Sequence, residues 1–131
     1  MERIETTAIR NLIHNEEYCR KVLPFIKEEY FTDRLEKLIF TEIYQFVNKY
    51  NNLPTKESLS IEMNTNKGVS EDEYKKMNEI ISSLNPEPIN LDWLVETTEV
   101  WCKDRAIHNA ILGGIQILDG KDKDHTPEYL P

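Results

Sequence analysis

The chain has 131 residues, of which 39% are hydrophobic and 31% are charged. This length and balance fit one folded domain with a core, and they exclude a disordered chain. The formal net charge of −8 argues against direct binding of DNA or RNA, because that binding draws on Lys and Arg that neutralise phosphates. We therefore expect little nucleic-acid binding and a surface suited to protein partners.

The sequence shows neither a membrane span nor a secretion signal. A charged or amide residue interrupts every apolar run within a few positions, and the N-terminus lacks the apolar core of a signal peptide. Cys19 and Cys102 belong to no ligand framework, so reduced thiols in a cytoplasmic protein are the simplest interpretation. A disulfide between the two cysteines stays open as an alternative.

Apolar residues recur at helical spacing along the first half of the chain, and no alternating strand pattern occurs. The spacing predicts helices over 5–13 and 16–23, separated by a break at His14-Asn15. A third helix is predicted over 33–50, with Thr32 as its cap and Asp33 near the positive end of its dipole. Its apolar side chains are expected to face the core: Leu35, Leu38, Ile39, Ile43, Phe46, Val47 and Tyr50.

The second half of the chain begins with two short helices. Thr55 is expected to cap a helix that carries Leu59, and Ser70 with Glu73 forms a capping box that opens a helix reaching residue 84. A proline-containing break over 85–89 follows. The sequence therefore predicts an all-α head over residues 1–89.

Asn90 is expected to cap a long helix over 90–120 with two apolar stripes on opposite sides. The first stripe is expected to pack on the head, and it consists of Leu91, Leu94, Val95, Cys102 and Ala106. The head is also expected to cover the second stripe near Trp93, whereas the part from Ile107 onward is predicted to contact another chain or helix. The candidate protein-interaction residues are those of the second stripe: Trp93, Val100, Ile107, Ile111, Gly114 and Leu118.

The end of the chain suggests that the long helix is the first arm of a truncated helical hairpin. Residues 121–131 read as a charged turn followed by the start signal of a further helix at Thr126-Pro127. The paired glycines Gly113-Gly114 weaken the helix interior and are expected to favour fraying beyond them. We therefore expect this chain by itself to be a monomer or a weak dimer.

No motif for catalysis, cofactor binding or metal binding stands out. The segment from Gly114 to Asp122 has five residues between its glycines and an Asp in place of the hydroxyl residue, so it does not match a phosphate-binding loop. Asp104 and His108 lie one turn apart, but a metal site needs three or four ligands. Neither His14 nor His125 has a recognisable partner. A small hydrolase that uses carboxylates brought together by the fold stays open as a minor alternative.

Several ordered groups of residues resemble the N-terminal domain of DnaB-like replicative DNA helicases. The resemblance rests on Leu12-Ile13, Lys21-Val22, Ile26, Glu29, Phe31 and Leu38-Ile39-Phe40 with Ile43. It is closer to the T-even-type phage branch through Tyr50, Leu53-Pro54-Thr55, Leu59, Asp92 to Glu99, Arg105-Ala106 and Asn109-Ala110. An Asp-Val-Val-Thr run that is frequent in bacterial members is absent.

The resemblance implies an assembly and partner-docking domain that is not itself catalytic. In that family, paired hairpins help to build a hexameric ring, the N-terminal tier recruits primase, and a helicase loader is a further possible partner. ATP and Mg²⁺ would belong to a separate C-terminal domain, and the protein would work in the host cell cytoplasm. The alternative is a free-standing all-α regulator of a replication machine, such as a helicase loader or inhibitor.

Overall fold

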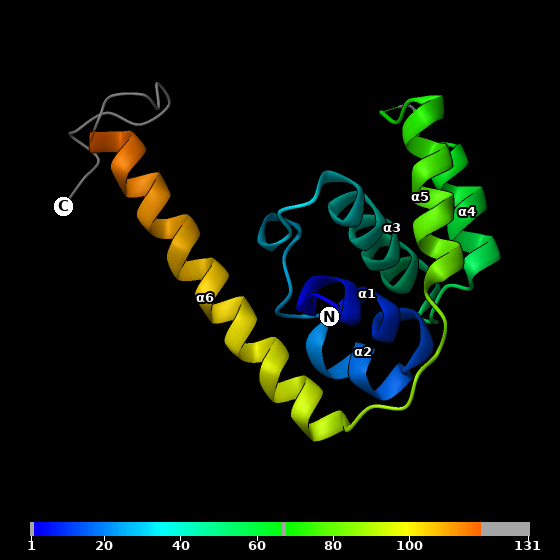
Figure 1. Ribbon diagram of the computed structural model, residues 1–131, viewed down its shortest axis with the longest axis horizontal. Helices are drawn as coiled ribbons and strands as arrows, with labels where there is room; N and C mark the ends of the chain where they lie inside the picture. The colour runs from blue at the N-terminus through cyan, green and yellow to red at the C-terminus, as the bar shows by residue number, and fades with distance from the viewer. Residues whose placement is uncertain (1, 67, 119–131) are drawn as a thin grey trace.

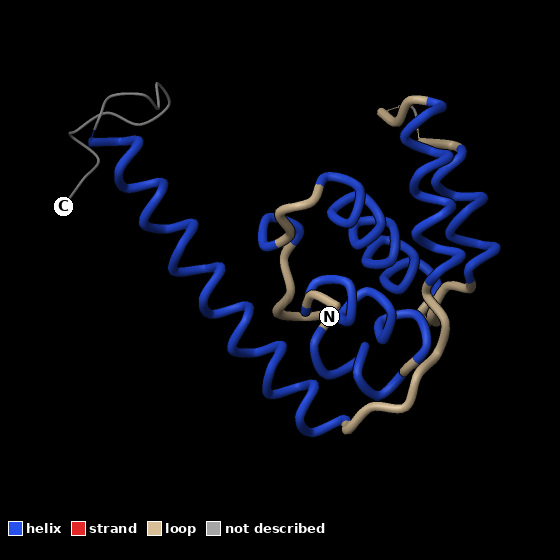
Figure 2. The backbone as a smooth tube through the Cα atoms, in the orientation of Figure 1, coloured by secondary structure: helices blue, strands red, loops and turns tan. Residues whose placement is uncertain are grey.

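The computed structural model describes residues 2–66 and 68–118, with side chains up to Gly114. Within these residues all regular structure is helical, which confirms the all-α prediction (Figure 2). The predicted turn and helix start over residues 121–131 lie outside the described residues. The elements in chain order are α1 (Ile4–His14), α2 (Glu16–Val22), the 3-10 helix η1 (Glu28–Tyr30), α3 (Arg34–Tyr50), α4 (Lys56–Asn64), α5 (Glu71–Ser83) and α6 (Leu91–Leu118).

Helices α1, α2 and α3 form the centre of the molecule. Helices α4 and α5 lie side by side as a hairpin that packs on α3, at one side of the molecule (Figure 1). Helix α6 contacts α1, α2 and η1 on the other side, and its second half extends past them (Figure 1). Because other helices lie against α6 only as far as Asn109, the two ends of α6 have different surroundings.

Side-chain caps at the helix starts explain most of the observed boundaries. Ser70 forms the predicted capping box with Glu73, and Thr55 is the predicted cap of α4, where Ser58 completes a capping box that was not predicted. The cap predicted for α3 was wrong by one position, because Asp33 rather than Thr32 accepts the free amides of Leu35 and Glu36. A carboxylate at this place also suits the positive end of the helix dipole.

The buried face of α3 is rotated from the predicted one. Ile39, Phe40 and Ile43 are at most 2% exposed, as expected for a core face. The prediction that Phe46 and Tyr50 face the core was wrong: their rings pack against each other with centroids 4.7 Å apart, and Tyr50 is exposed. The core instead reaches Glu36, which hydrophobic spacing assigns to the surface.

Burial of Glu36 is possible because the N-terminal segment supplies its partners. The guanidinium of Arg3 donates to one carboxylate oxygen at 2.5 Å, and the hydroxyl of Thr6 donates to the other at 2.6 Å. A buried carboxylate with both oxygens hydrogen-bonded avoids most of the cost of desolvation. This pair of contacts joins the start of the chain to α3.

The end of α5 and the segment that follows it are held by side chains of α1 and α4. His14, for which the sequence indicated no partner, places Nε2 2.6 Å from the carbonyl oxygen of Leu84. Lys56 donates to the carbonyl of Ser82 and to the side chain of Asn85. These contacts fix the point from which α6 begins.

Candidate functional site

The candidate site is the surface of α6 that points away from the head. The helix begins at Leu91, and the side chain of Asn90 accepts the amide of Trp93 at 2.9 Å, as the predicted cap requires. Its 28 residues span about 40 Å at 1.5 Å per residue. The helix continues through Gly113 and Gly114 to Leu118, so the predicted weakness at the glycines does not end it.

The side of α6 that faces the head is buried and partly polar. Leu94 and Thr98 are fully buried, and the hydroxyl of Thr98 donates to the carbonyl of Leu94 while it lies 2.7 Å from the hydroxyl of Tyr18. One turn further, the Trp101 ring packs edge-on against Phe31, with centroids 5.1 Å apart. This side anchors the first half of the helix.

Two polar side chains extend the anchored region along α6. Nε of Arg105 donates to the carbonyl of Tyr30 at 3.1 Å, and Nδ2 of Asn109 donates to the carbonyl of Glu29 at 3.2 Å. Both contacts hold η1 against α6. Asn109 is the last residue of α6 that makes such a contact within the described part of the chain.

The opposite side of α6 carries four large apolar side chains that nothing in the described chain covers. Trp93, Val100, Ile107 and Ile111 are 53%, 55%, 60% and 57% exposed. Their spacings of 7, 7 and 4 residues keep them on one side of a helix with 3.6 residues per turn. We call these four residues the apolar face of α6.

The structure corrects two details of the sequence-based assignment. The head does not cover Trp93, because its contacts lie on the opposite side of the helix. Ala106, which was assigned to the buried stripe, is exposed, and Arg105 and Asn109 take that contact instead. Hydrophobic spacing misses these two polar residues because it counts only apolar ones.

The remaining candidate positions fall at the far end of α6. Gly114 is half-buried and has nothing within 4 Å of the place where a Cβ atom would lie, and the side chain of Leu118 lies outside the described residues. Leu112, which was not among the candidate residues, is 45% exposed. Its position next to Ile111 would have signalled a wider apolar surface beyond Asn109.

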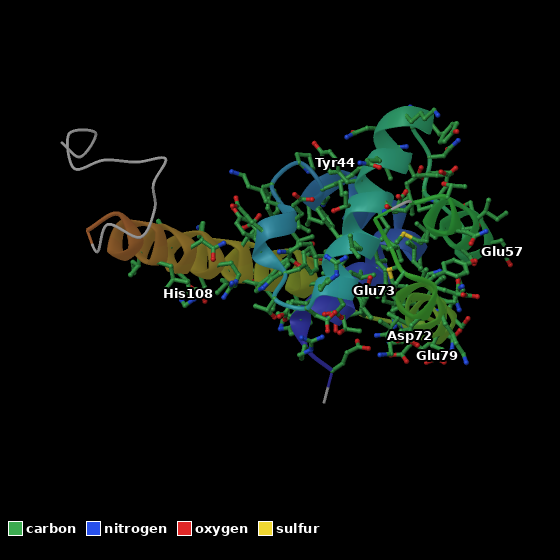
Figure 3. All side chains as sticks on the ribbon, turned by 90° about the horizontal axis from the view of Figure 1, so that it is seen from above. Tyr44, Glu57, Asp72, Glu73, Glu79 and His108 are labelled. Atoms are coloured by element: carbon green, nitrogen blue, oxygen red, sulfur yellow. The ribbon has the colours of Figure 1, made fainter. Side chains whose placement is uncertain are left out.

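The titratable groups of the described residues do not form a recognisable reaction centre. No group of three or more His, Cys, Asp or Glu side chains in this part of the chain is placed to hold a metal ion. Asp104 and His108 are exposed on α6, and Figure 3 shows His108 on this helix. Cys19 and Cys102 are buried free thiols, and burial raises their pKa values to about 11 and about 12, which keeps both protonated at neutral pH.

No protein-family model matches the chain. Over 109 residues, or 83% of this chain, it is 33% identical to the DnaB-like replicative helicase of Enterobacteria phage T4. The chain is related to this phage DnaB-like helicase. The match spans 23% of the helicase's length, so the similarity concerns one part of a much larger protein. In the described part of this chain, no helix is both long enough and apolar enough to cross a membrane.

Proposed function

We propose that this chain is the N-terminal assembly and partner-docking domain of a DnaB-like replicative DNA helicase of a phage, acting in the host cell cytoplasm. The apolar face of α6 carries the proposal. Four large apolar side chains in one row on a soluble domain mark a surface that another protein covers. The relationship to the T4 helicase supports a role in DNA replication.

The proposed partner of the apolar face is the same region of a neighbouring helicase subunit. A head anchored along one side of α6 leaves the other side open to a second helix over several turns. Paired helices from neighbouring subunits would contribute to a hexameric ring, and the assembled tier would recruit primase, with a helicase loader as a further partner. Docking across two subunits would gain affinity through avidity.

In this proposal the domain itself performs no catalysis. ATP and Mg²⁺ would serve another region of the helicase, and this chain would bind neither saturably. The net charge of −8 would also keep the affinity of this domain for DNA low at physiological salt. Calorimetric titration with Mg²⁺-ATP tests this part, and stoichiometric micromolar binding would contradict it.

Light scattering over a concentration series tests the proposed self-association. We expect a weak dimer that Ile107→Asp or Ile111→Asp dissociates, because a carboxylate buried in the contact would lose several kcal/mol of hydration. Ala106→Asp is the matched control, since it adds the same charge to an exposed position on another side of α6. A wild-type chain that is monomeric throughout, or equal effects of Ile107→Asp and Ala106→Asp, would refute self-association through this face.

Deletion tests the docking role in the whole helicase. Removal of residues 1–118 is expected to abolish stimulation of the helicase by its primase while ATP hydrolysis continues. Full primase-dependent stimulation after the deletion would contradict the proposed role.

A further inference from the structure

A second surface feature lies away from the apolar face of α6. The segment that joins α2 to α3 passes over α3 and leaves a groove of about 490 Å³ beside it. Most residues that line this groove have apolar, aromatic or acidic side chains: Pro24, Ile26, Glu28, Glu29, Phe40 and Tyr44. Lys27 also lines the groove and brings one positive charge to it. Such a volume falls within the range of roughly 300–1,000 Å³ that is usual for ligand pockets.

The floor of the groove is apolar and presents an aromatic ring. Ile26 and Phe40 are buried, while Tyr44 is 41% exposed and its ring centroid lies 6.1 Å from that of Phe40. Tyr44 lies apart from the acidic residues Asp72 and Glu79 of α5 (Figure 3). The exposed ring therefore belongs to this groove and not to the charged surface of the α4–α5 hairpin.

Two carboxylates stand at the edge of the same groove. Glu28 and Glu29 are exposed, and neither forms an ion pair with a cation in the described part of the chain. The hydroxyl of Thr41 lies 2.8 Å from Oε2 of Glu28 and 2.9 Å from the carbonyl oxygen of Lys37, so these two acceptors share its one hydrogen, and Oε1 of Glu28 stays available. Both residues therefore present negative charge beside an apolar floor.

The edge of the groove is held in place from α6. Asn109 donates to the main-chain carbonyl of Glu29, and Arg105 donates to that of Tyr30. A binding surface that is already ordered loses less conformational entropy when a partner docks. The contacts that anchor α6 thus also hold the main chain that carries the two carboxylates.

We propose that this groove is a socket for an arginine side chain of a partner protein. A guanidinium stacks on an exposed aromatic ring and donates two parallel hydrogen bonds to a carboxylate, whereas the aliphatic part of the arginine side chain packs on apolar surface. The groove offers all three surfaces: the ring of Tyr44, the carboxylates of Glu28 and Glu29, and the apolar floor. The socket is separate from the apolar face of α6 and does not depend on the proposed helicase role.

NMR titration of the ¹⁵N-labelled chain with acetyl-Gly-Arg-Gly-amide at low salt tests the proposal. The matched probe has citrulline in place of arginine, which keeps the shape and removes the charge. The arginine peptide is expected to shift amide signals of residues 27–30 and 40–44, and to bind several-fold more tightly than the citrulline peptide. Equal binding of both peptides, or shifts located elsewhere, would overturn the proposal.

Variants of the groove separate its two recognition elements. Tyr44→Leu keeps apolar area but removes the aromatic ring, so it should weaken binding about two- to fivefold, whereas Tyr44→Phe should retain it. Glu28→Gln combined with Glu29→Gln should abolish the preference for arginine over citrulline. Lys27→Ala should tighten binding, because Lys27 places a like charge beside the groove. Unchanged affinities in the Tyr44→Leu and double Gln variants would show that the groove is not the site.

Discussion

The hydroxyl of Tyr18 in α2 lies 2.7 Å from the hydroxyl of Thr98 in α6, and both side chains are fully buried. The Thr98 hydroxyl donates its hydrogen to the carbonyl of Leu94, so Tyr18 is the donor to Thr98. This chain of two hydrogen bonds connects the head to the first half of α6. It satisfies two polar groups in the interior.

The direction of this hydrogen bond predicts an order of stabilities. Thr98→Val leaves the Tyr18 hydroxyl buried without an acceptor and should cost about 1–3 kcal/mol, whereas Tyr18→Phe should cost only about 0.5–1.5 kcal/mol. Urea denaturation of both single variants and of the double variant measures the difference. A larger cost for Tyr18→Phe would mean that the donor has been assigned wrongly.

The buried thiols predict a loss of stability in alkali. Cys19 and Cys102 have ordinary pKa values of 9.0, which burial raises to about 11 and about 12 in the folded state. Below pH 9 both thiols are protonated in the folded and in the unfolded state, and their full contribution to the free energy of unfolding is present. Above pH 9 the unfolded state loses the thiol protons before the folded state does. Each thiol therefore lowers the free energy of unfolding by about 1.4 kcal/mol per pH unit until its folded-state pKa is reached.

Urea denaturation between pH 8 and roughly pH 12 checks this dependence. Burial also raises the pKa of Tyr18, which adds a further loss above pH 10. Cys102→Ala should lower the stability at neutral pH. It should also reduce the slope of the free energy of unfolding against pH, above pH 9, by the contribution of one thiol. A slope that is unchanged in this variant would show that Cys102 does not titrate as its burial indicates.

Two isoleucines offer a matched test of the core. Ile43 of α3 is fully buried, and Ile43→Ala should cost about 2–5 kcal/mol through lost burial and the cavity it leaves. Ile61 of α4 is 66% exposed, so the same substitution there should change stability by less than about 0.5 kcal/mol. Denaturant midpoints measure both, and near-wild-type stability of Ile43→Ala would show that α3 is wrongly oriented.

The contact between Asn109 and η1 predicts a local effect. Asn109→Ala removes the hydrogen bond to the Glu29 carbonyl, so the amides of residues 28–31 should exchange faster with solvent while the global unfolding free energy falls by at most about 1.5 kcal/mol. His108→Ala is the control, because His108 is exposed on the same helix. Equal exchange in the two variants would show that Asn109 does not hold η1.

Much of this fold followed from local chemistry in the sequence. The capping box at Ser70 and the caps at Thr55 and Asn90 were predicted correctly, because a capping side chain acts on amides only two or three residues away. The two-sided character of α6 was also predicted, since helical periodicity alone places Leu94 and Ile107 on different sides. Residues close in sequence carried both predictions.

The tertiary structure decided how those helices face one another. Burial of Glu36 depended on Arg3 and Thr6, which lie about thirty residues away along the chain, and local spacing could not indicate these partners. The exposure of Trp93 depended on which side of α6 the head occupies, and that side is set by Tyr18 and η1. The sequence shows that α6 has two apolar sides, but only packing between distant segments selects the side left open for a partner.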